Sequence, residues 1–295
     1  MDYFSIKQSY YTGSYSQVLK ELAKQEVDSD DTLLFYKAKV QTTLKQYESN
    51  ASAGTLGNAL DAYNEFLKSK NISKLEKLIV KESATPFELH LIASAKAVLG
   101  EYEDSLKFCV QGIDSDEVVG TSELLLLAIE VALLNEQYNV ASTLFLNYTS
   151  AHNDEISNED ELIINIAESY IKFATNQDAT TSNFYHFEEL AQSFPTWRTQ
   201  LGLLNLHLQQ GSIPQAEEIV NTLESDYYMV EQKDIAEVFL PHLLASKITL
   251  AIMQGDENVD QLRTELVKLA PEHSFSKTNK EIHSKFDELV SKYSS

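Results

Sequence analysis

The chain has 295 residues, of which 45 are Asp or Glu and 23 are Lys or Arg, giving a formal net charge of −22 at neutral pH. This excess of negative charge disfavours binding to nucleic acid or to an anionic membrane surface, because both carry charge of the same sign. Apolar residues make up 43% of the chain, which is enough to form a hydrophobic core and excludes disorder by composition.

The sequence predicts a cytoplasmic protein with no membrane-spanning segment. Cys109 is the single cysteine, so no internal disulfide can form, and the N-terminus lacks the apolar run of a secretory signal. The longest apolar run, 124–134, contains Glu130 and is shorter than the roughly 20 residues that a spanning helix needs. We expect the protein to associate with membranes only by binding a partner protein, without inserting into the bilayer itself.

The scarcity of turn-forming residues predicts a protein built of helices. The chain contains 9 Gly and 5 Pro, well below the usual shares of about 7% and 5%. Apolar residues recur at spacings of three and four across 87–99 and 123–134, and no segment alternates as a strand would. The expected fold class is therefore all-α.

Three stretches carry the chemistry of a helix N-terminus. Asp30 and Asp31 place negative charge in a predicted first turn, where it complements the helix dipole. Residues 85–88, Thr-Pro-Phe-Glu, offer a hydroxyl N-cap, a proline at the first helical position and a glutamate three residues after the cap. Residues 212–215, Ser-Ile-Pro-Gln, repeat this arrangement with the proline one place later.

Turns of similar sequence recur along the chain. Gly100-Glu-Tyr separates two amphipathic segments, and Glu136-Gln-Tyr follows it 36 residues later. Other copies begin at Gly13, Gly211 and Gly255. The pattern resembles the tetratricopeptide repeat, a helix pair of 34 residues, although 31–83 and 161–195 fit only with insertions.

Small residues fall where the two helices of each repeat should cross. A close crossing needs short side chains, and a turn tyrosine can then cover the end of the pair. The small residues are Ala93, Ser105, Ala128, Ala141 and Ala216, and the tyrosines are Tyr15, Tyr102 and Tyr138. Because such pairs bury their apolar faces by stacking, we predict one right-handed α-solenoid over 1–295, with about five to six repeats and a charged capping helix near 278–293.

The whole chain resembles the epsilon subunits of the COPI coatomer, in their fungal, budding-yeast-like version. The resemblance rests on the opening FSIKQSYYTGSYSQVLKEL, on LGEYEDSLKFCVQGID and on the acidic, capped array. It implies a non-catalytic subunit that binds and stabilises the C-terminal domain of the coatomer alpha subunit, one to one. It also implies a role in retrograde Golgi-to-ER and intra-Golgi transport, at Golgi membranes and coated vesicles, with no cofactor.

In repeats of this class the first helix of each pair lines a concave groove, which predicts where a partner binds. We expect apolar anchors there at Tyr10, Leu126, Leu133, Leu201 and Leu208, because contiguous exposed apolar surface marks interaction sites. The alternative is that some of these leucines pack against the next repeat. The full predicted set is Tyr3, Tyr10, Phe35, Phe87, His90, Leu126, Glu130, Leu133, Arg198, Leu201, Asn205, Leu208, His242 and Ile252.

Residues that invite other functions fit better as structure. The seven histidines show no metal-binding spacing, Cys109 falls on an inward helix face, Trp197 lies at a repeat junction, and no phosphate-binding glycine motif occurs. A co-chaperone or other peptide-binding adaptor is the main alternative, but its carboxylate clamp would have only Lys7 and Arg198. A solenoid hydrolase lacks a nucleophile with a base at a plausible spacing.

Overall fold

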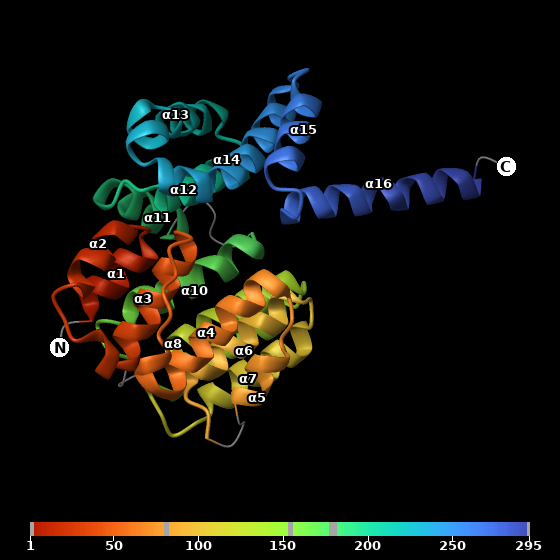
Figure 1. The fold of residues 1–295 in the computed structure, drawn as a ribbon. Coiled ribbons are helices and arrows are strands. Elements are labelled where there is room, and N and C mark those ends of the chain that lie inside the picture. Colours follow the sequence, from red (N-terminus) through yellow and green to blue (C-terminus); the bar gives the residue numbers. More distant parts are fainter. Residues whose placement is uncertain (1–2, 80–82, 153–155, 177–181, 294–295) are drawn as a thin grey trace. The chain divides into compact units, whose positions relative to one another are not determined.

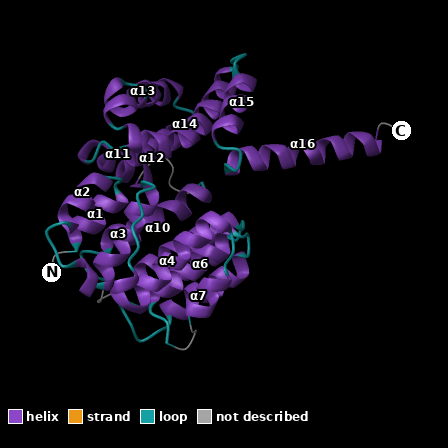
Figure 2. Cartoon of the chain, in the orientation of Figure 1, coloured by secondary structure: helices purple, strands orange, loops and turns teal. Residues whose placement is uncertain are grey.

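The structure, a computed structural model, describes residues 3–79, 83–152, 156–176 and 182–293. These residues form helices joined by loops and turns, with no strand among them, as Figure 2 shows. The all-α prediction is confirmed. The right-handed superhelix and the single array over 1–295 stay predictions.

The chain divides into two compact units, Met1–Asn183 and Phe184–Ser295. The first unit contains ten α-helices in its described residues (Figure 1): α1 (Phe4–Tyr11), α2 (Tyr15–Leu22), α3 (Asp31–Thr43), α4 (Gly54–Ser69), α5 (Ser73–Leu78), α6 (Pro86–Val98), α7 (Tyr102–Ile113), α8 (Thr121–Leu134), α9 (Tyr138–Ala151) and α10 (Glu161–Ala174). Short 3₁₀ turns at Val27–Ser29 and Ala51–Ala53 lie between them.

Helix α11 (Ser182–Ser193) begins at the boundary, and the second unit continues with α12 (Trp197–Gln210), α13 (Ile213–Leu223), α14 (Lys233–Gln254), α15 (Val259–Leu269) and α16 (Ser274–Tyr293). A π-helical turn at Tyr227–Glu231 precedes α14. Consecutive helices pack as the predicted pairs α1 with α2, α6 with α7, α8 with α9, α12 with α13 and α14 with α15.

The predicted turns all adopt the left-handed backbone conformation. Gly100 has a φ of 80° and Glu136, at the equivalent place, has a φ of 58°. Gly13, Gly211 and Gly255 share it. Lys45 after α3 and Asn176 after α10 also have positive φ, so the stretches whose register drifts contain turns of the same kind without glycine.

The helix N-termini are confirmed in part. The Thr85 side chain accepts from the backbone N–H of Glu88 and the Glu88 carboxylate accepts from that of Thr85, a complete capping box. Asp30 is the N-cap of α3, accepting from the Leu33 N–H at 3.0 Å. Ser212 is the N-cap residue of α13 with the proline in the first turn, as predicted, but its side chain makes no capping hydrogen bond.

Small residues lie at the helix crossings as predicted. Ala93, Ser105, Ala128, Ala141 and Ala216 are all fully buried, and the Ser105 hydroxyl donates to the Ala93 carbonyl at 2.8 Å, joining α7 to α6. Among the turn tyrosines, Tyr15 is buried, but Tyr138 is 42% exposed and does not cover its turn. Cys109 is buried as expected, and burial raises the pKa of its thiol to about 12.

Helix α14 is long and apolar enough to cross a membrane by length and composition. This differs from the expectation that no segment reaches that length. Leu243, Leu244, Ile248 and Leu250 on this helix are nevertheless buried in the two hydrophobic clusters of the second unit. Their packing gives α14 the role of a core helix.

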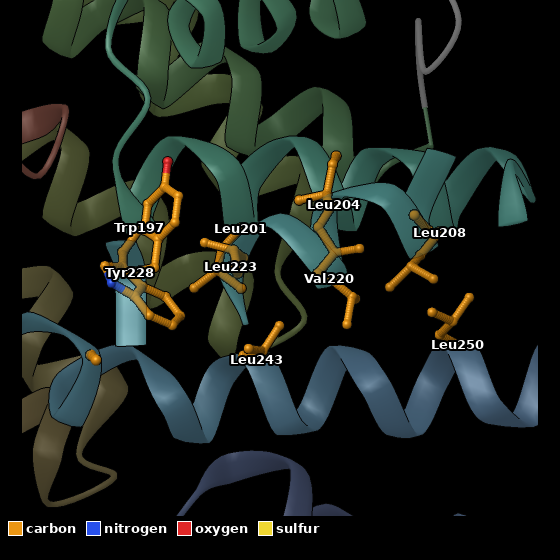
Figure 3. Close-up of a cluster of buried hydrophobic side chains, with 12 residues drawn as sticks. Trp197, Leu201, Leu204, Leu208, Val220, Leu223, Tyr228, Leu243 and Leu250 are labelled. Atoms are coloured by element: carbon orange, nitrogen blue, oxygen red, sulfur yellow. The ribbon is translucent and has the colours of Figure 1, made fainter. Parts of the chain in front are cut away.

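Trp197 anchors the larger of these clusters, between α12 and α14 (Figure 3). Its ring is fully buried, with the Tyr228 ring perpendicular to it at 5.6 Å and the Phe239 ring parallel at 6.4 Å between centroids. The interpretation of Trp197 as a packing residue is therefore confirmed. The indole N–H finds no hydrogen-bond acceptor among the described residues.

We predict that Trp197→Ala lowers the free energy of unfolding by about 3–5 kcal/mol, because it leaves a large cavity in this cluster. Trp197→Phe should cost only about 1–2 kcal/mol, since it removes volume without breaking a hydrogen bond of the indole. Urea unfolding followed by circular dichroism measures both. Equal losses in the two variants would contradict the packing role.

Candidate partner-binding surfaces

A buried ionic cluster joins four parts of the first unit. The ammonium nitrogen of Lys7, on α1, lies 3.1 Å from a carboxylate oxygen of Glu123 on α8. It lies 2.5 Å from Asp160, which immediately precedes α10. The Tyr36 hydroxyl of α3 donates to Glu123 at 2.7 Å, and the Ser122 hydroxyl bridges both carboxylates at 3.0 and 2.9 Å.

The two carboxylates of this cluster keep its single ammonium charged. Burial alone would lower the pKa of Lys7, but the carboxylates of Glu123 and Asp160 outweigh it and hold that pKa above its usual value. Burial and the neighbouring Glu123 raise the pKa of Tyr36 well above its usual value. The ammonium therefore stays charged, with its partners supplied by the protein itself.

This cluster brings the start and the end of the first unit together. Lys7 and Asp160 are 153 residues apart, and α1 also packs against α10. Lys7 is 6% exposed. It therefore cannot serve as the cation of a carboxylate clamp in an open groove, which removes one of the two candidates that the sequence offered.

Four of the predicted groove residues of this unit form an aromatic core. The Phe35 ring stacks on Phe87 at 4.5 Å and meets His90 edge-on at 5.0 Å. The Tyr10 ring lies 5.1 Å from the Tyr36 ring, which lies 5.7 Å from that of Phe35. All four predicted residues are buried, because the first helices of successive pairs pack against one another through these rings.

The structure therefore corrects the predicted anchors. Tyr10, Leu126, Leu201 and Leu208 lie at 5–8% exposure and belong to the cores of their units, and Leu133 is half-buried. The alternative, packing against neighbouring helices, holds for these four. Of the remaining predicted residues, Phe35, Phe87 and His90 are buried, Tyr3, Glu130 and Arg198 are half-buried, and Asn205, His242 and Ile252 are exposed.

The three exposed residues lie on α12 and α14, the first helices of two packed pairs. The Asn205 amide oxygen accepts from the Ser246 hydroxyl at 2.9 Å, which joins α12 to α14. Ser246 lies one turn after His242, on the same side of α14. Ile252, further along α14, is 51% exposed. Helices α12 and α14 therefore keep both polar and apolar groups accessible.

A second accessible surface lies on α16 and was missed by the sequence prediction. Its apolar residues Ile282, Phe286, Leu289 and Tyr293 are 60%, 62%, 54% and 76% exposed. The spacing of four, three and four residues places them along one side of the helix, which we call the α16 stripe. Their spacing was visible in the sequence, but the predicted capping role implied that they were covered.

No group of three or more metal-ligating side chains converges among the described residues. A surface hollow of about 690 Å³ between α2, the turn at Val27–Ser29 and α3 is lined by Leu22, Val27, Lys37 and Gln41 among others. Lys37 there lies 4.0 Å from Asp28 at the surface. These side chains do not form a nucleophile–base arrangement.

Comparison with known proteins gives a match over nearly the whole chain. The family described as "Coatomer epsilon subunit" matches residues 2–294. The chain is 57% identical over 293 residues to the coatomer subunit epsilon of Saccharomyces cerevisiae, covering 99% of both chains.

We predict that Lys7→Met destabilises the protein by about 3–5 kcal/mol, because it leaves the Glu123 carboxylate buried without its cation. Adding Glu123→Gln should restore part of the loss, since the amide can still accept from Tyr36 and removes the buried charge. Urea unfolding followed by circular dichroism measures these changes.

The matched control is Lys107→Met, which breaks an exposed pair with Asp104 at 2.8 Å. It should change the free energy of unfolding by no more than about 0.5 kcal/mol. A loss from Lys7→Met as small as that of the control would show that the buried cluster does not stabilise the unit.

We predict that His90 makes stability fall with acidification. Burial, with a contribution from Lys39, holds the pKa of His90 well below its usual value, so the unfolded chain binds a proton that the folded chain rejects. Below about pH 6.5 the free energy of unfolding therefore falls by up to about 1.4 kcal/mol per pH unit on account of His90. His90→Gln should show a shallower decrease between pH 7 and 5 than the wild type.

The control is His283→Gln on the exposed surface of α16. It should leave the pH profile of the unfolding free energy unchanged. Identical slopes for wild type and His90→Gln would contradict the prediction.

Proposed function

The chain belongs to the coatomer epsilon subunit family, and from this we propose that it binds and stabilises the C-terminal domain of the coatomer alpha subunit, one to one, as a non-catalytic part of the COPI coat. In this role it supports retrograde Golgi-to-ER and intra-Golgi vesicle transport. It works from the cytoplasm and reaches Golgi membranes and coated vesicles through the coat.

The observation that carries the proposal is the identity of 57% across 99% of both chains. A match of this length spans both compact units, so the family assignment rests on all the helix pairs and not on one of them. A scaffold role is supported by the first unit, where the buried charge of Lys7 is paired with Glu123 and Asp160 inside the fold. An adaptor needs a stable scaffold and accessible surface, and the helix pairs supply both.

We place the first contact with the alpha-subunit domain on the exposed face of α12 and α14. Asn205, His242 and Ile252 are the accessible members of the predicted groove, and Arg198 lies at the start of the same α12. A partner segment there would meet hydrogen-bonding side chains beside an exposed isoleucine. The buried leucines Leu201 and Leu208 pack in the hydrophobic cluster of the second unit and do not reach the partner.

The alternative of a co-chaperone that binds peptide carboxylates is less well supported. Such a clamp needs several accessible cations, but Lys7 is already paired with Glu123 and Asp160. Arg198 is then the one basic residue left in the predicted set. The net charge of −22 also disfavours acidic peptides.

The test is isothermal titration of the full chain with the purified C-terminal domain of the alpha subunit. We predict one-to-one binding that Ile252→Asp weakens by about tenfold or more, because it places a charge in an apolar contact. Leu201→Asp is not informative, since Leu201 is 6% exposed and its replacement would unfold the second unit.

Val267→Asp is the matched control, because Val267 is 52% exposed on α15, the second helix of the same pair, against 51% for Ile252. It should leave the affinity unchanged. No binding by the wild type would overturn the proposed function. If both variants leave the affinity unchanged, the proposed function stands, but the assignment of the contact to the α12–α14 face is wrong.

A further inference from the structure

We propose that α16 is a second docking element for the alpha-subunit domain, and that its apolar stripe packs on an apolar surface of that domain whose rim carries carboxylates. The inference rests on the proposed function, because it names a further surface for the same partner. It concerns the C-terminal helix alone and does not depend on the α12–α14 face.

The first argument is exposure. None of the residues of α16 is buried, although the helix runs for 20 residues. The four side chains of the α16 stripe are each more than half exposed. Figure 1 shows α16 leaving the end of α15 as a single helix. A soluble helix with an uncovered line of large apolar side chains is typical of a surface that another molecule covers.

The second argument is that only the first turn of α16 is held by its own unit. Phe275 packs against the cluster that includes Leu244 and Ile248 on α14. Just before the helix, a ring nitrogen of His273 lies 3.1 Å from one of His242. Most helical stability in proteins comes from tertiary packing of an amphipathic face, so the remaining turns of α16 gain stability when a partner covers them.

The third argument is charge. At 100° per residue, Lys285 and Lys292 lie about 60–80° from the stripe and follow one of its edges. Glu281 and Glu288 lie one turn before Lys285 and Lys292, about 40° further from the stripe, and Asp287 lies beyond its other edge. With four lysines and three carboxylates α16 has a net charge of +1, within a chain of −22. The surface that it fits therefore has an apolar centre and acidic groups opposite the two lysines.

Two other occupants fit the helix less well. A second copy of this chain would bring two molecules of charge −22 together. An anionic membrane would meet the three carboxylates of α16 as well as its lysines, whereas membrane-surface helices concentrate Lys and Arg on their polar face. A coat protein of opposite local charge avoids both conflicts.

The experiment compares three double variants of the full chain by isothermal titration with the same purified domain of the alpha subunit. Ile282→Asp with Leu289→Asp disrupts the stripe and should weaken binding by about tenfold or more. Lys285→Glu with Lys292→Glu should weaken binding several-fold and reduce its dependence on salt.

The control, Ser284→Asp with Ser291→Asp, adds two charges to the opposite side of the same helix. Both serines are exposed, and their hydroxyls bond only backbone carbonyls of α16, at 3.0 and 2.8 Å. This variant should bind within about twofold of the wild type. It separates loss of the stripe from a general effect of added charge on the helix.

The outcomes distinguish this inference from the proposed function. No binding by the wild type overturns both. Wild-type binding that the stripe variant retains overturns the α16 inference alone. If the stripe variant keeps its affinity but no longer forms a dimer that the wild type forms in sedimentation equilibrium, the occupant is a second copy of the chain. If it keeps its affinity but no longer floats with phosphatidylserine vesicles as the wild type does, the occupant is a membrane. Either result overturns the inference.

Discussion

The first unit depends on one buried cation. Water would solvate the Lys7 ammonium well, and moving it into the interior is favourable only because Glu123 and Asp160 meet it there with Tyr36 and Ser122 completing the hydrogen bonds. These groups come from α1, α3, α8 and the residue before α10. Their alignment therefore requires all of these helices in register, and it joins the beginning of the unit to its end.

This internal pairing determines what each unit presents to other molecules. In the first unit, the rings of Tyr10, Phe35 and Phe87 are used in packing, so these side chains are not available to a partner. In the second unit, α12 and α14 bury leucines on one side and expose Asn205 and Ile252 on another. Helix α16 goes further and exposes its apolar side over most of its length.

Local chemistry was predictable from the sequence, as was the burial of Cys109 and Trp197, whereas the burial of the predicted groove residues was not. The capping box at Thr85 and the glycine turns follow from interactions within a few residues. Lys45 and Asn176 adopt the same turn conformation without glycine and were not predicted, whereas the turn at Glu136 was predicted from the tyrosine two residues later. Periodicity identified the apolar face containing Leu126, but whether a neighbouring helix covers that face depends on residues far away in the chain. For the same reason Lys7 looked accessible.

The distance of 153 residues between Lys7 and Asp160 has a consequence for biosynthesis. At a translation rate of about 5–20 residues per second, the ribosome needs about 8–30 seconds to produce the second carboxylate after the lysine. Until then Lys7 lacks its Asp160 partner and α1 lacks its contact with α10, so the apolar faces of the early helices stay without their final neighbours. The ionic cluster of the first unit can therefore be completed only after Asp160 has been synthesised, and such non-local contacts slow folding.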